Sequence, residues 1–403
     1  MRRTATRRAT GLMATLLAFG LASNPATGQE PANSWTDAAD MPSVADAVAR
    51  GVEIILDRQE GEGNAEWPYQ GVYRVNGKIP IGYRVGGSAI ASHALLAAPG
   101  YDEDDARQAA VARATQFIIE STDHELMQHA FESRYDVRGW GYAYGLAHLL
   151  RLKAAGRMPA ELADAAEEAV QFYLDGIAAT AIPERGGWNY SRRAGFQAPG
   201  RPSPFMTGPT LLALFEAVRQ GYEVDADLIE AGIAALEAAR TPTGAFVYAG
   251  DNGVSSRSAV PGSVGRMLVG EATLLLAGRG SVDRVRGAVD AFIVHWDWLD
   301  QRRAKNGTHV KPYGVAPYYF YYAHYFAAMA IELLPDQERE EYRRRFRDLL
   351  FSVRLEDGAW NDRVFDRSAN YGTAMSVLAL VMPELPRPTG FPPPAPAAPA
   401  AVD

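Results

Sequence analysis

The 403-residue sequence contains no cysteine. This absence excludes disulfide bonds, thiolate nucleophiles, thiolate metal ligands and iron–sulfur clusters. It also excludes the acylated cysteine that anchors a bacterial lipoprotein. Any chemistry that the chain performs must therefore use other groups, such as tyrosine, histidine, arginine, lysine and the carboxylates.

An excess of positive charge is absent as well. The chain has 40 Lys and Arg residues against 48 Asp and Glu residues, which gives a net charge of −8. Proteins that bind nucleic acid carry a basic surface, so the composition predicts no nucleic-acid partner. The apolar content of 47% and the charged content of 22% are typical of a globular chain with a large core.

The N-terminal segment lacks the length of apolar sequence that spans a bilayer. Four arginines between positions 2 and 8 precede an apolar run at 11–22, and small polar residues follow it. This order is typical of a signal peptide, with an uncleaved anchor as the alternative. We expect residues 1–29 to be removed, leaving a periplasmic or secreted protein with no stable membrane anchor. The sequence leaves open whether general secretion or twin-arginine export carries it.

The C-terminal segment lacks a folding pattern. Residues 386–403 are dominated by proline and alanine, which favour an extended, disordered tail over a packed structure. The sequence therefore predicts one globular domain over residues 30–385.

A pattern of small and branched apolar residues at helical spacing recurs within that domain. Because each copy is apolar on nearly all sides, it predicts a buried helix. The copies begin, on average 57 residues apart, at Gly87, Gly145, Gly208, Gly270, Ala323 and Gly372.

An amphipathic helix with one charged face precedes each buried helix. These segments begin at Ala45, Asp105, Ala163, Ala226, Val282 and Gln337. Six hairpins of this kind can stack as an open solenoid or close into a ring. Closure leaves no end to be capped, so we predict an all-α, six-hairpin (α/α)6 toroid with a central cavity. Tyr73–Val85 could add a small β-hairpin around Asn76–Gly77.

Three of the connecting loops share a Gly-x-aromatic signature, which ends at Trp188, Phe246 and Trp360. With the helix repeat, this signature resembles the terpenoid cyclase and protein prenyltransferase superfamily, whose members carry prenyltransferase and squalene oxidase repeats. That family has a Gln-x3-Gly-x-Trp motif, but Arg240 and Arg354 stand here at the glutamine positions. The resemblance implies the α/α toroid fold and does not by itself imply a reaction.

The known chemistries of this fold can be tested against the sequence. The zinc site of the prenyltransferases and the thioester of complement-like domains both need a cysteine, so both are excluded. Residues 102–105 read Asp-Glu-Asp-Asp and match the acidic motif of class II triterpene cyclases. They precede an outer helix, however, as Asp225 and Asp227 do in another hairpin. We therefore interpret these acids as helix caps rather than as a proton donor.

Aromatic and cationic residues cluster where the loops should meet at one mouth of the ring. Aromatic walls with nearby polar groups suit a sugar chain or an isoprenoid. Packing between neighbouring repeats is the competing interpretation for any single tryptophan. The predicted binding residues are Trp67, Tyr83, Trp140, Tyr142, Trp188, Tyr190, Lys311, Tyr313, Tyr318, Trp360, Asp362 and Tyr371.

The fifth buried helix is unusual because tyrosines replace aliphatic residues along it. Tyr318 and Tyr322 are four residues apart, and His324 lies beside them. His324 could act as a general acid or base near neutral pH, although a core histidine bonded to a tyrosine is the simpler interpretation. With Arg84 as an anion-binding group, Tyr322 and His324 make a candidate catalytic set for proton abstraction beside a uronate.

Three functions remain open. The chain could be an exported repeat protein that binds an elongated small molecule or glycan in the cavity, with no reaction assigned. It could be a polysaccharide lyase or hydrolase, for which Glu271, Asp362 and Asp366 are the carboxylates best placed. It could also be a terpenoid cyclase-like enzyme. No metal or cofactor site is predicted, because His124 and His129 are five residues apart and lack the HExxH spacing.

Overall fold

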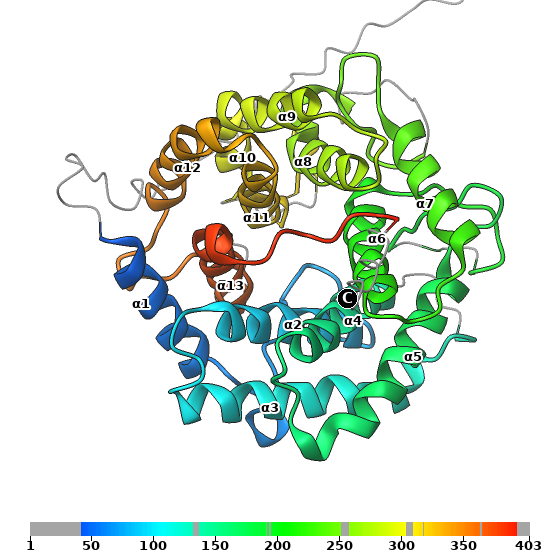
Figure 1. Cartoon of the computed structure of the whole chain (residues 1–403), viewed down its shortest axis with the longest axis vertical. Coiled ribbons are helices and arrows are strands. Elements are labelled where there is room, and N and C mark those ends of the chain that lie inside the picture. The colour runs from blue at the N-terminus through cyan, green and yellow to red at the C-terminus, as the bar shows by residue number, and fades with distance from the viewer. Residues whose placement is uncertain are drawn as a thin grey trace, which may run out of the picture.

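The structure is a computed structural model that describes residues 42–131, 137–190, 192, 195–250, 258–303, 309–316, 318–362 and 365–392. Its helices form two concentric layers (Figure 1). The outer layer contains α1 (Val44–Asp57), α3 (Asp105–Glu120), α5 (Ala163–Thr180), α7 (Ala226–Ala239), α9 (Val282–Val294) and α12 (Asp336–Phe351). The inner layer contains α2 (Ile81–Ala97), α4 (Arg138–Ala154), α6 (Pro204–Arg219), α8 (Val260–Leu276), α11 (Tyr319–Glu332) and α13 (Ala369–Val381).

The inner layer closes into a ring. Each inner helix packs against the next, from α2 through α4, α6, α8 and α11 to α13, and α13 packs against both α2 and α1. The first and last hairpins are therefore neighbours, which confirms the predicted (α/α)6 toroid and excludes the open solenoid. A short additional helix, α10 (Trp296–Arg303), follows α9. The described residues contain isolated β-bridges but no strand.

The outer helices begin at side-chain caps. Ser43 accepts a hydrogen bond from the Asp46 amide at 3.1 Å, and Asp104 accepts one from the Arg107 amide at 3.0 Å. Asp225 caps α7 in the same way. These bonds satisfy amides that have no partner within the helix. Asp104 is thus a helix cap, as its place before an amphipathic segment indicates.

The inner helices begin earlier than the repeated glycines indicate. α2 starts at Ile81 rather than Gly87, and α4 starts at Arg138 rather than Gly145. Consequently Tyr83 and Trp140 lie on the first turns of helices and not on loops, and Tyr371 on α13 does the same. The expected β-hairpin is reduced to a tight turn, with Asn76 and Gly77 at positive φ, because its second half forms the start of α2.

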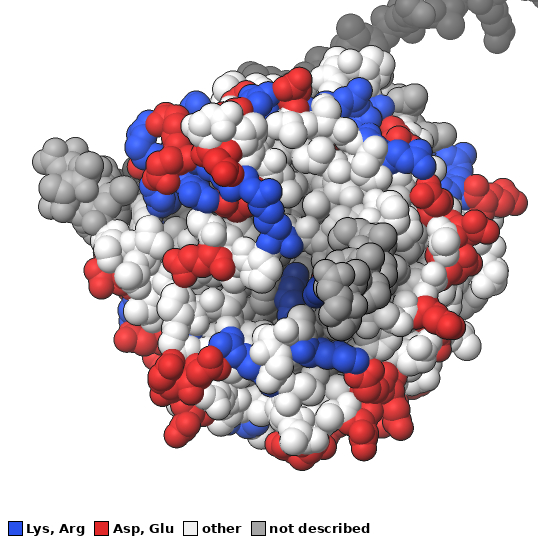
Figure 2. Space-filling model, viewed as in Figure 1, with Lys and Arg blue, Asp and Glu red and all other residues white. Residues whose placement is uncertain are grey.

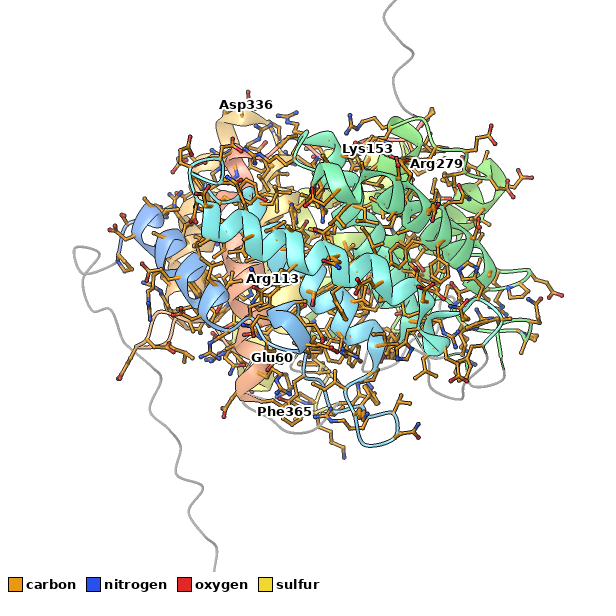
Figure 3. The ribbon with its side chains drawn as sticks, turned by 90° about the horizontal axis from the view of Figure 1, so that it is seen from below. Glu60, Arg113, Lys153, Arg279, Asp336 and Phe365 are labelled. Atoms are coloured by element: carbon orange, nitrogen blue, oxygen red, sulfur yellow. The ribbon has the colours of Figure 1, made fainter. Side chains whose placement is uncertain are left out.

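The two ends of the ring differ. Figure 3 places Glu60 and Phe365 at one end and Lys153, Arg279 and Asp336 at the other. Phe365 lies one short 3-10 turn (Asp366–Ser368) before α13, whereas Lys153 lies in the last turn of α4. Inner helices therefore start at the first end and finish at the second. The finishing face carries Lys and Arg around its centre (Figure 2), where cations complement the negative ends of the helices.

The C-terminal segment crosses the finishing face (Figure 1). The Phe391 ring stacks on Phe215 of α6, with centroids 5.3 Å apart and planes 14° apart. The Phe391 amide donates to the Leu276 carbonyl at 2.9 Å, and the Thr389 hydroxyl donates to Glu216 at 2.6 Å. Residues 386–392 of the expected tail are thus placed against the ring. The expected signal peptide, residues 1–29, lies outside the described residues.

Candidate functional site

A pocket lies on the ring axis at the end where the inner helices begin. It encloses about 360 Å³ of space, including the part open to solvent. None of its lining side chains is charged. The lining residues are Tyr69, Tyr83, Trp140, Tyr190, Phe205, Met206, Tyr318 and Tyr371. The inner helices supply most of them from their first turns, so ring closure is what brings them together.

One side of the pocket is a wall of four rings, which we call the α2 wall: Tyr69, Tyr83, Trp140 and Tyr371. Tyr69 is its centre, with ring centroids 5.3 Å from Tyr83, 5.6 Å from Trp140 and 4.8 Å from Tyr371. Tyr83 and Trp140 meet edge to face at 5.5 Å. These separations are those of favourable aromatic pairs, so the wall is a packed and rigid surface.

The other side is the α6 wall, formed by Tyr190, Phe205 and Tyr318. The Phe205 ring lies 6.1 Å from Tyr190 and 5.4 Å from Tyr318. Phe205 also packs on Tyr322, at 4.4 Å, so the wall continues into the core. The pocket is therefore a slot between two aromatic surfaces.

A row of hydrogen-bonding groups supports the α6 wall. The hydroxyls of Tyr190 and Tyr248 are in contact, and that of Tyr318 lies 3.4 Å from that of Tyr190. The His309 Nδ1 lies 3.0 Å from the Gly314 carbonyl and can donate to it, which leaves Nε2 to accept from the Tyr248 hydroxyl at 3.4 Å. This row fixes the orientation of Tyr190 at the slot.

A fully buried carboxylate stands behind the α2 wall. Asp362 accepts a hydrogen bond from the Ser368 hydroxyl at 2.6 Å. Burial, and next the charge of Asp362, raise the pKa of Tyr69 well above its usual value. Burial also raises the pKa values of Tyr190, Tyr318 and Tyr371. The slot tyrosines are thus neutral at ordinary pH and serve as hydrogen-bonding groups rather than as phenolate bases.

The three predicted catalytic residues do not come together. Arg84 forms a two-pronged ion pair with Glu66, with both nitrogen–oxygen distances at 2.6 Å, and lies over Phe117 of the outer helix α3. Tyr322 is buried, and its hydroxyl donates to the Phe205 carbonyl at 3.0 Å. The arrangement expected for proton abstraction beside a uronate is therefore absent.

His324 faces the outer layer and not the pocket. Trp296 donates its indole N–H to Nε2 of His324 at 2.9 Å, and Nδ1 donates to the Phe320 carbonyl at 2.7 Å. Both ring nitrogens are thus occupied, and burial lowers the histidine's pKa to about 3. His324 is a core histidine, as the simpler interpretation has it, although its partner is a tryptophan rather than a tyrosine.

Three of the predicted binding tryptophans join the layers of the ring instead of lining the pocket. Trp67, Trp188 and Trp360 are buried. Their indole N–H groups donate to carbonyls near the ends of the preceding outer helices: Ile55 at 2.6 Å, Ile177 at 2.8 Å and Leu350 at 3.0 Å. Their amides donate to hydroxyls of the following inner helices: Ser88 at 2.9 Å, Thr207 at 3.0 Å and Thr373 at 3.1 Å.

Other predicted residues lie elsewhere. Tyr142 packs against α5 through Tyr173, at 6.1 Å, and its hydroxyl contacts the Met127 carbonyl. Lys311 is exposed, and Tyr313 packs edge to face on Trp298 at 5.0 Å. None of these three lines the pocket.

The candidate carboxylates do not form a pair in the slot. Glu271 is bound on both oxygens by Arg240, at 2.8 and 2.7 Å, and Asp366 is exposed. Asp362 is therefore the one of the three that lies next to the slot walls. The described residues contain no group of three or more His, Asp or Glu side chains arranged to hold a metal ion.

Five of the predicted binding residues do line the pocket: Tyr83, Trp140, Tyr190, Tyr318 and Tyr371. The other three lining residues, Tyr69, Phe205 and Met206, are not among the predicted binding residues. Phe205 and Met206 belong to the first turn of α6. The signal that could have found them is position, because Phe205 stands as close to the start of its inner helix as Trp140 and Tyr371 do to the starts of theirs.

No family model matches the sequence, and no curated protein matches it. Solved structures do match its fold. An unsaturated glucuronyl hydrolase from Bacillus sp. GL1 aligns over 87% of this chain and 98% of its own, with a TM-score of 0.53 and 14% identity. The chain has the (α/α)6 toroid fold of these enzymes.

Two further structures show the same relationship. The α-1,6-mannanase GH76A of Salegentibacter sp. HEL1_6 aligns over 84% of this chain and 100% of its own, with a TM-score of 0.51 and 12% identity. A type II terpene cyclase from Scytonema aligns over 85% and 98%, with a TM-score of 0.50 and 13% identity. Its presence confirms the resemblance to the terpenoid cyclase fold. At these identities the likeness concerns the fold alone.

Within the described residues, no helix combines the length and apolarity needed to cross a bilayer.

Proposed function

We propose that the protein binds the end of a glycan chain in the slot between the α2 wall and the α6 wall. The observation that carries this proposal is the slot itself, which has rigid aromatic surfaces on two facing sides. A sugar ring has apolar C–H faces and a polar rim. Aromatic rings pack against the faces, while hydroxyl groups at the edge of the slot bond to the rim.

The space of about 360 Å³ at the slot includes open solvent, so the part enclosed by protein is smaller. The slot would therefore hold the end of a chain against its aromatic walls, and the remainder of an elongated chain would extend into solvent. Two of the similar structures support a glycan ligand, because their names describe a glucuronyl hydrolase and a mannanase.

The proposal is one of binding rather than hydrolysis. Most glycoside hydrolases use two carboxyl groups on opposite sides of the bond that breaks. Of the predicted carboxylates, Asp362 alone lies next to the slot walls, and it is fully buried behind Tyr69. Glu271 is held in its pair with Arg240.

The test is a titration of the purified protein with α-1,6-mannotriose, cellotriose and chitotriose, followed by calorimetry and by tryptophan fluorescence. We expect at least one trisaccharide to bind and the Trp140→Phe variant to weaken binding roughly tenfold, because part of one aromatic surface is lost. Trp298→Phe is the matched control, since Trp298 lies outside the pocket. If Trp140→Phe bound the trisaccharide as tightly as the unaltered protein does, the slot would not be the binding site.

A second candidate is an apolar terpenoid ligand. It is favoured by the uncharged lining of the pocket and by the likeness to a type II terpene cyclase. The same titration with farnesol and geranylgeraniol separates the two functions. Binding of the isoprenoid alcohols together with no binding of any trisaccharide would favour this candidate over the glycan.

We also propose that the protein acts outside the cytoplasm. The arginine-rich start and short apolar run of residues 1–29 support export. Expression of the full chain in a Gram-negative host, followed by fractionation and N-terminal sequencing, tests this. A product retained in the cytoplasm with residues 1–29 intact would refute export.

A further inference from the structure

The slot is lined almost entirely by aromatic rings. All of its lining residues except Met206 carry such a ring, and none of them carries a charge. The face of an aromatic ring is electronegative and attracts a cation, and the indole of a tryptophan such as Trp140 attracts it most strongly. The lining also contains no amide, carboxylate or guanidinium side chain to bond to the hydroxyls of a neutral sugar. Its composition therefore favours a ligand with a positive charge.

Aromatic faces elsewhere in the described part of the ring are covered by arginines. The guanidinium of Arg138 lies 4.7 Å from the ring centroid of Phe196. That of Arg266 lies 5.6 Å from the centroid of Tyr248 and 5.7 Å from that of Tyr319. These separations are within the ~6 Å of a cation–aromatic contact. Such contacts between the protein's own side chains are thus common in this fold.

Three rings of the α2 wall have no cation of this kind. Within the described residues, no lysine or arginine lies over Tyr69, Trp140 or Tyr371. The plane of Tyr69 is turned by 52° from that of Trp140 and by 60° from that of Tyr371. Because all three rings line one pocket, they face it from different directions. They form a corner that can surround a small cation, which is how aromatic cages hold ammonium groups.

Negative charge lies behind the same wall. Asp362 is fully buried and accepts a hydrogen bond from the Ser368 hydroxyl at 2.6 Å. Burial is the largest cause of the raised pKa values of Tyr69 and Tyr371, and the charge of Asp362 raises both further. The field of this carboxylate therefore reaches two of the rings that line the slot. It attracts a cation to the α2 wall and repels an anion from it.

Positive charge lies behind the opposite wall. The buried Arg266 packs on Tyr319, and the Tyr319 ring lies 4.8 Å from that of Phe205 in the α6 wall. Arg84, on the other side, is bound to Glu66 on both carboxylate oxygens. A cation in the slot is thus attracted to the α2 wall and repelled from the α6 wall, so the two walls are electrostatically different.

We infer that the α2 wall binds a protonated amine, and that the glycan end held in the slot is an amino sugar with a free amino group. An ammonium group is small enough for the enclosed part of the slot, and its sugar ring lies against the aromatic walls at the opening. A neutral sugar lacks the attraction of a cation to the rings, and a uronate meets the field of Asp362. This inference rests on the proposed glycan-binding function and names its class of sugar.

The first arm of the test compares cellotriose, chitotriose and the β-1,4-linked trisaccharide of glucosamine. The three differ in the group at C2 of each sugar, which is a hydroxyl, an acetamide or an ammonium. We expect the glucosamine trisaccharide to bind roughly tenfold more tightly than the other two, the effect of one cation–aromatic contact. The titrations contain about 0.3 M NaCl, because a chain with a net charge of −8 attracts any polycation at low salt.

The second arm uses Tyr371→Leu and Phe205→Leu as a matched pair. Each variant replaces one lining ring by an apolar side chain, the first in the α2 wall and the second in the α6 wall. Tyr371→Leu should remove most of the preference for the glucosamine trisaccharide over cellotriose. Phe205→Leu should weaken the binding of both in equal proportion and leave the preference unchanged. An equal loss of preference in the two variants would overturn the placement of the amine at the α2 wall.

The third arm uses Asp362→Asn, which removes the charge and keeps an oxygen that can accept the bond from Ser368. The preference for the glucosamine trisaccharide should fall, while the affinity for cellotriose should stay the same, because only the charged ligand responds to the field. A fall in both affinities would show a general packing effect and would contradict the role of the charge. Should Asp362→Asn fail to fold, Tyr371→Leu and Phe205→Leu still decide the inference.

The two proposals fail in different ways. If the unaltered protein binds cellotriose or chitotriose as tightly as the glucosamine trisaccharide, the inference is wrong and the glycan function stands. If it binds no sugar, both are wrong. Tight binding of the glucosamine trisaccharide that neither Tyr371→Leu nor Asp362→Asn weakens would show attraction to the acidic surface outside the slot, and it would also overturn the inference.

Discussion

The Cα of Gly372 faces the carbonyl oxygen of Trp360 so closely that a Cβ at this position would lie 2.4 Å from that oxygen. The same relationship recurs at Gly87, where a Cβ would meet the Trp67 carbonyl at 2.3 Å. In both cases the loop that carries the tryptophan runs directly over the inner helix. Gly87 and Gly372 are thus sites of close backbone approach.

Alanine substitution at these glycines should be severely destabilising. Gly372→Ala forces two backbone segments apart in the core, so we expect a loss of several kcal/mol, about 3 or more, in the free energy of unfolding. Urea denaturation measures it. Gly287→Ala is the matched control: it lies inside α9 with no atom within 4 Å of a new Cβ, so it should stabilise by about 1 kcal/mol. Equal effects at the two sites would contradict the close approach.

The tryptophans that join the layers make a second prediction. Trp360→Phe removes the bond from its indole N–H to the Leu350 carbonyl and leaves a buried acceptor without a partner. The expected cost is about 1–3 kcal/mol in unfolding free energy. Trisaccharide affinity should not change, because Trp360 does not line the pocket. Trp140→Phe should weaken trisaccharide binding and change the free energy of unfolding less than Trp360→Phe does. If both substitutions weakened binding equally, the separate roles of Trp140 and Trp360 would be contradicted.

Buried histidines should make the protein sensitive to mild acid. Burial lowers the pKa values of His148 and His324 to about 3, against ~6.5 in an unfolded chain. Between these values the unfolded state binds more protons than the folded state, so stability falls as pH falls from about 6.5 toward 3. Each histidine contributes a slope of up to about 1.4 kcal/mol per pH unit.

The experiment compares urea unfolding from pH 7.5 to pH 4.5 for the unaltered protein and for His324→Gln. The variant should show a shallower loss of stability below pH 6.5. Above pH 7 the two slopes should coincide, because the histidine is neutral in both states there. Parallel curves over the whole range would show that His324 is not held neutral by burial.

The C-terminal segment gives a fourth prediction. Phe391→Ala removes the stack on Phe215. Hydrogen exchange of the amides at 389–391 should then become faster. The reason is that the hydrogen bond from the Phe391 amide to the Leu276 carbonyl is no longer supported by the stacked rings. Exchange in the N-terminal halves of α2 and α4 should not change, because these halves lie at the other end of the ring. Faster exchange throughout would show that the segment supports the whole fold.

Much of the fold could be predicted from the sequence. The alternation of amphipathic and fully apolar segments identified every outer and inner helix. A helix buried on one side has apolar residues on one face, and a helix buried on all sides is apolar all round, so both classes can be recognised from sequence. The boundaries were less certain. Tyr83, Trp140 and Tyr371 were expected on loops, but each begins an inner helix, since an aromatic residue on the first turn has no distinct pattern in sequence.

The site could be predicted only in part. Aromatic residues near the loops were correctly singled out, but the sequence could not separate Trp140, which lines the slot, from Trp360, which joins two layers. Both have the same side chain and similar neighbours. What distinguishes them is the direction in which each points, and this depends on packing between helices that are far apart in the chain.

The sequence by itself determined the repeat, the two helix classes and the exclusion of cysteine chemistry, because these follow from composition and local periodicity. Only the tertiary structure decided that His324 faces outward, that Arg84 pairs with Glu66, and that the slot has two aromatic walls. The physical reason is ring closure. It brings the first turns of α2, α4, α6 and α13 to one axis, and no local pattern records which side chains meet there.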